Sequence, residues 1–116
     1  MKLPNADRAQ VERGKLVDYL LALEHVHGGP KARFFMDFGF SLSNWRELHA
    51  ALLRHALECE VTGTTSNPRG IYYVLEGAMQ MADGREAFVR TVWEIRWGDL
   101  EPRLVTAYPR GRKRQK

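Results

Sequence analysis

The sequence predicts an α+β fold in which about three N-terminal helices pack on a C-terminal antiparallel β-meander of three to four strands. Apolar residues in the first half recur at helical spacing, whereas after Cys59 the period changes to two, which is typical of strands. The length of 116 residues suits one domain. We place this α+β domain at 1–109 and a flexible basic tail at 110–116.

A first helix is predicted over about 12–24, because its apolar residues recur at i, i+3, i+4 and i+7. These residues mark the face that we expect to be buried: Leu16, Tyr19, Leu20 and Leu23. A second helix is predicted over 31–38. Pro30 suits its first turn, and Gly39 suits its C-terminal cap.

The third helix has the clearest start signal. Ser43 and Asn44 are good N-cap residues, and Glu47 lies three positions after Asn44, as a capping box requires. We expect this helix to run to about Glu58.

Three strands are predicted in the second half, over roughly 71–81, 86–97 and 103–108. Asp83-Gly84 is a strong hairpin signal between the first two, and Pro109 ends the last. The polar, turn-rich segment 62–69 is predicted as a loop whose start can add an edge strand. Because the helices cover one face of the sheet, a site can lie on the other face.

Composition excludes several classes of protein. No apolar run approaches the roughly 18–20 residues that span a bilayer, and the N-terminus lacks the apolar stretch of a signal peptide. Cys59 is the only cysteine, which excludes an internal disulfide. We therefore expect a cytoplasmic protein with no membrane contact, although secretion as part of a larger toxin would leave the same pattern.

The net charge of +4 is unevenly distributed. Five of the 18 lysines and arginines lie in the segment 110–116, whereas all 14 carboxylate side chains precede it. Such a tail can attract RNA phosphates or an acidic partner through counterion release. It can equally be a solubilising end, and composition alone leaves both interpretations open.

The densest cluster of polar residues is His25-x-His27-Gly28-Gly29-Pro30-Lys31-x-Arg33, with a flexible glycine pair at a helix start. Imidazoles transfer protons near neutral pH, and cations stabilise a developing phosphorane charge. A metal-independent ribonuclease uses these groups when the RNA 2′-hydroxyl attacks its own phosphate. His25, His27 and Lys31 are therefore candidate catalytic residues, and Arg33 is a candidate substrate-binding residue. The alternative is a solvated loop between helices.

A second candidate cluster lies on the last predicted strand. Thr106 and Tyr108 share one face by strand alternation, and Arg103 is expected on the other. Hydroxyl groups bind phosphate or act as weak proton donors, so Thr106 and Tyr108 join the catalytic candidates and Arg103 the substrate-binding ones. The alternative is the ordinary β propensity of threonine and tyrosine.

No metal site and no cofactor are predicted. His55 and Cys59 are spaced i, i+4, but no further ligand pair has recognisable spacing, so His55 is expected to be a partly buried helix residue. Gly-Gly-Pro-Lys is too short for a phosphate-binding P-loop. The tryptophans are predicted to be core residues rather than an exposed stacking platform: Trp45, Trp93 and Trp97.

Several segments form a recognisable series: MKLPNA at the start, KLxxYLL from Lys15, EHxxGxxKARFF from Glu24, FGF from Phe38, Trp45, TVW from Thr91 and PRLVTAYP from Pro102. Over nearly the whole chain up to the tail, this series resembles DUF6883, a family of small bacterial domains. Its layout is similar to the barnase–EndoU–colicin–RelE group of metal-independent ribonuclease toxins. The resemblance implies a site at His25, Lys31, Arg33, Thr106 and Tyr108.

The chain departs from the family pattern beside its first histidine. Where the family often has His-Pro, this chain has His25-Val26, and it adds His27. Which imidazole acts therefore stays open.

These features favour a toxin-like, metal-independent ribonuclease that cleaves RNA by transesterification, as in the toxin of a toxin–antitoxin pair. The main alternative is a non-catalytic module that binds protein or nucleic acid, and a third is a regulatory partner that itself binds a toxin. The partners to expect are RNA, a small antitoxin or immunity protein and, through an uncovered sheet edge, a second copy of the chain.

Overall fold

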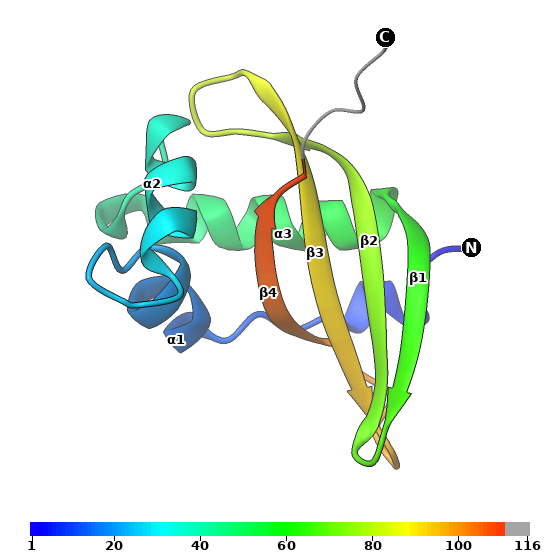
Figure 1. Cartoon of the computed structure of the whole chain (residues 1–116). Coiled ribbons are helices and arrows are strands. Elements are labelled where there is room, and N and C mark those ends of the chain that lie inside the picture. Colours follow the sequence, from blue (N-terminus) through cyan, green and yellow to red (C-terminus); the bar gives the residue numbers. More distant parts are fainter. Residues whose placement is uncertain (111–116) are drawn as a thin grey trace, which may run out of the picture.

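The computed structural model describes residues 1–110 (Figure 1). The helical elements come first: η1 (Ala6–Arg8), α1 (Arg13–Lys15), η2 (Leu16–Leu20), α2 (Gly29–Asp37), η3 (Leu42–Asn44) and α3 (Trp45–Glu58). The strands follow: β1 (Glu60–Asn67), β2 (Gly70–Gln80), β3 (Glu86–Arg96) and β4 (Arg103–Pro109). This order confirms the predicted α+β class. Of the predicted tail, Arg110 is described, and 111–116 lie outside the described residues.

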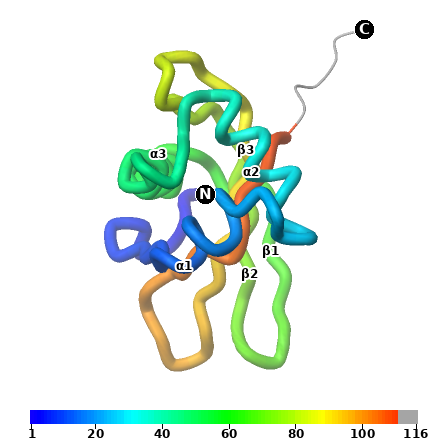
Figure 2. The backbone as a smooth tube through the Cα atoms, turned by 90° about the vertical axis from the view of Figure 1, so that its left-hand side faces the viewer, coloured from blue at the N-terminus to red at the C-terminus, as the bar shows by residue number. Residues whose placement is uncertain are grey.

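The strands form one antiparallel sheet in the order β1-β2-β3-β4. The segment 62–69, which was predicted mainly as a loop, is for the most part strand, because β1 pairs with β2 along its whole length. Its polar side chains suit a strand at the sheet edge. The predicted hairpin between β2 and β3 is confirmed, and Gly84 has a φ of 92°, which favours glycine. Figures 1 and 2 show the β1–β2 and β3–β4 connections at one end of the sheet.

Helix α3 crosses one face of the sheet and leaves the other open (Figure 1). Its apolar side chains at helical spacing are buried, as is Trp93 at the middle of β3. Trp93 therefore confirms its predicted core position. The prediction is wrong for Trp97, which is 58% exposed, because it directly follows the last residue of β3, Arg96, and so lies outside the sheet.

A polar chain crosses the core between α3 and the sheet. His55 is 1% exposed, so it is fully rather than partly buried. Its Nε2 lies 3.0 Å from the carbonyl oxygen of Val89 and 3.3 Å from that of Gly77, so Nε2 must carry the proton. Its Nδ1 can then accept from the hydroxyl of Thr91 at 3.1 Å, and that hydroxyl oxygen accepts from Trp93 Nε1 at 2.8 Å. The polar side-chain atoms of His55, Thr91 and Trp93 therefore all have hydrogen-bond partners.

The first predicted helix is shorter and more irregular than its apolar spacing suggests. After one turn of α1, the chain forms the π turn η2, in which the Leu21 amide donates to the Leu16 carbonyl at 2.8 Å. Helical structure ends at Leu20, so Leu23, which was predicted to be buried, is 51% exposed. The wider π turn places Tyr19 half-buried at the sheet edge instead of in the core. Single π turns are often found at functional sites.

The caps of the other helices follow the predicted chemistry with one change. Gly39 follows α2 with a φ of 98°, as a C-terminal cap residue does. The capping box, however, joins Ser41 and Asn44 around η3, rather than Asn44 and Glu47. Within residues 1–110, no helix is long and apolar enough to cross a membrane.

Candidate functional site

The candidate site lies along β4, where the helical half meets the sheet. Figures 1 and 2 place α1 and α2 beside this strand, and both contact it. The π turn η2 supplies Tyr19, α2 supplies Lys31, and β4 supplies Thr106 and Tyr108. Lys31 of the first predicted cluster and Thr106 and Tyr108 of the second are therefore brought to one edge of the sheet.

Tyr19 is the centre of this cluster. Its hydroxyl accepts a hydrogen bond from Lys31 Nζ and lies 3.1 Å from Thr106 Oγ1. The same ammonium group lies 5.7 Å from the ring centroid of Tyr108. The hydroxyl of Tyr19 therefore joins helix α2 to strand β4.

The surroundings of Tyr19 favour its ionised form. Burial raises the pKa of the phenol, but the hydrogen bonds of Lys31 and Thr106 and the positive charges of Lys31 and Lys15 outweigh it. The pKa of Tyr19 is therefore lowered below its usual value of about 10. As a phenolate, the oxygen would accept from both Lys31 and Thr106. Tyrosines with a lowered pKa are suited to proton transfer.

His25 packs against Tyr19 and holds the loop before α2. The two ring centroids are 5.0 Å apart in an edge-on arrangement. His25 Nδ1 accepts from the backbone amides of His27 at 3.0 Å and Gly28 at 2.9 Å. Because amides only donate, the proton of a neutral His25 must lie on Nε2. His27 itself is exposed, and its ring centroid is 6.1 Å from that of His25.

The glycine pair after His27 is tightly packed rather than flexible. Gly28 and Gly29 are both buried. A Cβ at Gly28 would lie 2.1 Å from the carbonyl oxygen of Tyr19, and one at Gly29 would lie 2.6 Å from that of Leu23. These glycines allow the loop to close directly onto the π turn that carries Tyr19.

An open cleft of about 660 Å³ adjoins this cluster, and it is lined by Tyr19, Thr106, His25, His27 and Lys15, among others. Lys31 and Tyr108 are not part of its lining. Tyr19 and Thr106 therefore connect the two histidines in the cleft to the ammonium group of Lys31.

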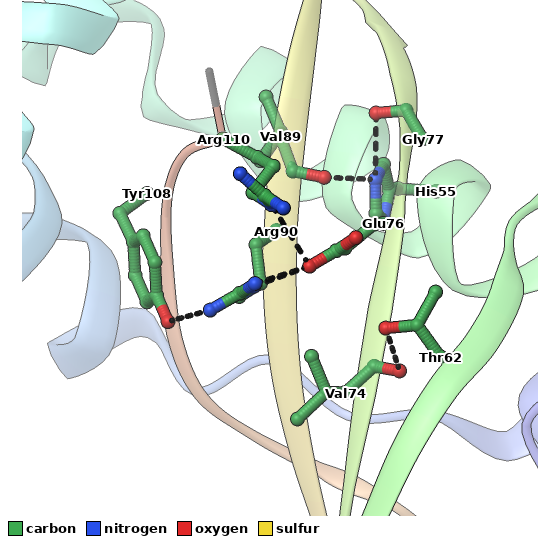
Figure 3. A network of polar contacts seen from close by, with 9 residues as sticks. All are labelled: His55, Thr62, Val74, Glu76, Gly77, Val89, Arg90, Tyr108 and Arg110. Carbon is green, nitrogen blue, oxygen red and sulfur yellow. Dashed lines mark hydrogen bonds and ion pairs between the residues drawn. The ribbon is translucent and has the colours of Figure 1, made fainter. Parts of the chain in front are cut away.

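A second polar network lies next to the cluster on the open sheet face, and Figure 3 shows it. Arg90 donates from Nε to Glu76 Oε2 at 2.7 Å and from Nη1 to the Tyr108 hydroxyl at 3.2 Å. Arg110 donates to the same Glu76 oxygen at 3.1 Å. Burial raises the pKa of Glu76, but the two guanidinium groups outweigh it, so the pKa is lowered. Glu76 is therefore a carboxylate that positions both arginines.

The two predicted substrate-binding arginines lie outside these contacts. Arg33 is exposed on α2. Arg103 donates to Glu12 at 3.3 Å. The register skips Val105, so Arg103 pairs with Glu94 and falls on the same sheet face as Thr106 and Tyr108. The predicted opposite face is wrong, because simple alternation fails at this bulge.

Within residues 1–110, no three histidine, cysteine or carboxylate side chains gather in a way that would hold a metal ion. The polar groups around Tyr19 and Tyr108 carry the cations Lys31, Arg90 and Arg110 against one carboxylate, Glu76. The adjoining cleft is lined by Lys15 and by the carboxylates Glu12 and Asp18. The cationic group suits an anionic ligand.

The model of one protein family, the domain of unknown function DUF6883, matches residues 2–111. The chain belongs to the DUF6883 family. This match confirms the resemblance seen in the sequence. No curated protein matches this DUF6883 chain.

Among solved structures, this DUF6883 domain is similar to a chain of a contact-dependent growth inhibition toxin–immunity protein complex from Klebsiella pneumoniae 342. The TM-score is 0.69, and the alignment covers 86% of this chain and 98% of that chain. Because the sequences are only 11% identical, the similarity shows a shared fold and nothing about a site.

Sequence reasoning missed four residues of the candidate site and the network beside it: Tyr19, Glu76, Arg90 and Arg110. Tyr19 was placed with the apolar stripe of a regular helix, although its hydroxyl needs a partner when it is half-buried. Glu76 and Arg90 each interrupt an apolar strand on the face opposite Trp93. A charged residue at such a position is the signal that could have found them.

Proposed function

We propose that this DUF6883 domain is a toxin-like, metal-independent ribonuclease that cleaves RNA by transesterification. The observation that carries the proposal is the hydrogen-bonded series Lys31–Tyr19–Thr106 beside a cleft that contains His25 and His27. A base with a lowered pKa, an adjacent cation and imidazoles are the groups that this reaction requires.

In the proposed reaction, the Tyr19 phenolate accepts the proton of the RNA 2′-hydroxyl. The 2′-oxygen attacks the adjacent phosphorus, and the bond from phosphorus to the 5′-oxygen breaks. The leaving 5′-oxygen takes a proton from the imidazolium form of His25 or His27, which becomes a neutral imidazole, and the products are a 2′,3′-cyclic phosphate and a 5′-hydroxyl. No oxidant, reductant or further reactant is needed.

The remaining residues position and stabilise the reacting groups. Lys31 stabilises the phenolate before the proton transfer, and its charge then stabilises the phosphorane. Thr106 and Tyr108 orient the phosphate, since their hydroxyl groups lie on the same face of β4. The Tyr108 oxygen accepts from Arg90, which leaves its own proton available for a phosphoryl oxygen.

The fold of the solved neighbour supports a toxin system as the biological setting. That structure is named as a toxin–immunity protein complex, so a domain of this shape occurs in such a pair. That name covers both proteins of the complex, so it supports a protein partner in general. For a toxin-like domain, we propose a small antitoxin or immunity protein as that partner.

Expression of the chain in bacteria, with growth and RNA integrity as readouts, tests the proposal. We expect the wild type to arrest growth and to produce RNA fragments with 2′,3′-cyclic phosphate ends. Lys31→Ala should reduce cleavage by at least about 100-fold, as expected for the loss of a group that acts in the transition state.

Arg54→Ala is the matched control, because Arg54 is an exposed cation on α3, away from β4. It should retain most of the activity. If the purified wild type leaves tRNA and mRNA intact over hours, and expression does not slow growth, the ribonuclease proposal is wrong and a non-catalytic binding module is favoured.

A further inference from the structure

We propose that Arg90 and Arg110, held by Glu76, form a binding subsite for the phosphate that neighbours the scissile phosphate in a single-stranded RNA. This inference rests on the proposed function for the identity of the polymer. The residues themselves lie outside the cluster around Tyr19, and Tyr108 contacts both groups.

The charge balance of the network favours an added anion. Two guanidinium groups share one carboxylate, and both hydrogen bond to the same oxygen, Glu76 Oε2. Within the described chain, no other carboxylate forms a hydrogen bond or ion pair with Arg90 or Arg110. The network therefore carries an excess positive charge on the open sheet face.

Arg110 has unused donors for a ligand. A guanidinium group carries five N–H donors, and in residues 1–110 the side chain of Arg110 hydrogen bonds only through Nε. Its side chain is 41% exposed, whereas that of Arg90 is 30% exposed. The outer N–H groups of Arg110 are thus placed by Glu76 and remain able to bind phosphate oxygens in a fork.

A purely structural role accounts poorly for this arrangement. Ion pairs of partly exposed arginines such as these contribute little to stability. The Arg110 amide already donates to the Phe88 carbonyl at 3.0 Å, so the backbone holds this end of β4 without the side chain. The role left for Glu76 is to position the two guanidinium groups beside the proposed reaction site.

The spacing along β4 matches the repeat of a nucleic acid strand. Tyr108 pairs with Arg90, and Thr106 pairs with Val92, which is the next position on the same face. Two residues along a strand span roughly 6.6 Å. Successive phosphates of an extended single strand are separated by a similar distance, so a phosphate at Thr106 places its neighbour beside Arg90 and Arg110.

The ring of Tyr108 separates the two phosphate positions. Lys31 Nζ and Arg90 Cζ each lie 5.7 Å from its centroid. Figure 3 shows Tyr108, Arg90, Glu76 and Arg110 as one connected series across β4, β3 and β2. The ring of Tyr108 therefore has one cation from α2 and one from β3 close to it.

Binding of non-cleavable probes to the full chain tests the subsite. The probes are 2′-O-methyl dinucleotides without a terminal phosphate, with a 5′-phosphate and with a 3′-phosphate, measured by calorimetry at low salt. We expect one of the two terminal phosphates to lower Kd by about 10-fold or more. Arg110→Ala should abolish that gain and leave the affinity for the unphosphorylated dinucleotide unchanged.

Arg54→Ala is the matched control, because Arg54 is an exposed arginine paired with Glu58 on α3, which covers the opposite face of the sheet. It should keep the full gain. With a longer 2′-O-methyl strand, Arg110→Ala should also reduce the salt dependence of log K by about 0.7, the amount expected for one lost phosphate contact. Melting temperatures of both variants establish that they are folded.

The subsite is overturned if neither terminal phosphate tightens binding, or if the gain survives in Arg110→Ala. An acidic peptide of equal charge that binds as tightly as the phosphorylated probe would also overturn it, in favour of a protein partner. Because the probes cannot be cleaved, the outcome is separate from catalysis. A protein that never cleaves RNA but shows the Arg110-dependent gain would refute the proposed function and keep the subsite.

Discussion

Lys31 donates a hydrogen bond to the hydroxyl of Tyr19, although the two residues belong to different helical elements. This contact connects α2 to the π turn η2 and places the positively charged ammonium group of Lys31 beside the phenol oxygen of Tyr19. Position and reactivity of Tyr19 therefore depend on the same side chain, and substitutions at the pair can separate the two effects.

Tyr19→Phe should reduce RNA cleavage by about 10²–10⁴-fold, the usual contribution of a general base. The ring remains, so its packing against His25 should be kept. In the wild type, cleavage should rise with pH as the phenol ionises, and the lowered pKa places this rise below the usual tyrosine range. Rates of the chemical step from single-turnover experiments across pH measure both effects.

Residual cleavage in Lys31→Ala carries a second prediction. Without the ammonium group, the pKa of Tyr19 loses two of the effects that lower it, so the rise in rate should move to higher pH. Lys15→Ala, which removes a smaller effect, should shift the profile less. A profile that does not move in Lys31→Ala would exclude Tyr19 as the base.

His25→Asn and His25→Ala distinguish loop positioning from proton transfer. The Asn side-chain oxygen can accept from the amides of residues 27 and 28 in place of Nδ1. If His25 mainly holds the loop, His25→Asn should keep cleavage within about 10-fold of wild type, whereas His25→Ala should lose more. If His25 is the acid, both variants should be equally impaired, because general acid catalysis contributes about 10²–10⁴-fold.

Acidification should destabilise the fold through His55. Burial lowers the pKa of His55 below its usual value, and it outweighs the hydrogen bonds to Gly77 and Val89, which favour the charged form. The unfolded chain therefore binds a proton near pH 6.5 that the folded chain does not bind until lower pH. The free energy of unfolding should fall as pH drops below about 6.5, with a slope of up to about 1.4 kcal/mol per pH unit.

Urea denaturation at pH 7, 6 and 5 measures this slope, and His55→Gln should reduce it. The carboxylates with a lowered pKa, such as Glu76, act at more acidic pH, so they contribute little in this range. An unchanged slope in His55→Gln would assign the pH dependence to other groups.

Gly77→Ala should cost about 1–3 kcal/mol of stability, the usual effect of overpacking a core. The added Cβ would lie 2.4 Å from the Sγ atom of Cys59. In a double-mutant cycle, Cys59→Ala should therefore recover part of the loss. Gly63→Ala is the control, because nothing lies within 4 Å of its added Cβ. Additive effects of the two core substitutions would contradict the predicted clash.

The sequence predicts the strands better than their register. Period-two spacing along β3 places Val89, Thr91 and Trp93 on one face, and the structure buries all three, whereas Trp97 at the same spacing is exposed. The bulge at Val105 leaves no mark in the alternation, since it depends on pairing with β3. For the same reason, the face of Arg103 could not be predicted.

The candidate site was predicted only where its residues are close in sequence. His25, His27 and Lys31 form a visible cluster, and Thr106 and Tyr108 form another. Their meeting at Tyr19 depends on a π turn, which apolar spacing does not reveal. Glu76 lies on β2, Arg90 on β3 and Arg110 just after β4, so only the pairing of the strands brings them together.

The lack of space for a side chain between Gly28 and the Tyr19 carbonyl restricts which substitutions this domain can accept. A side chain at position 28 has no space unless the backbone at position 19 moves, and that movement would carry the phenol away from Lys31 and Thr106. Members of the family that replace this glycine should therefore also differ at positions 19, 31 and 106. An alignment can show whether these four positions change together, and so whether lineages have discarded the site as a unit while keeping the fold.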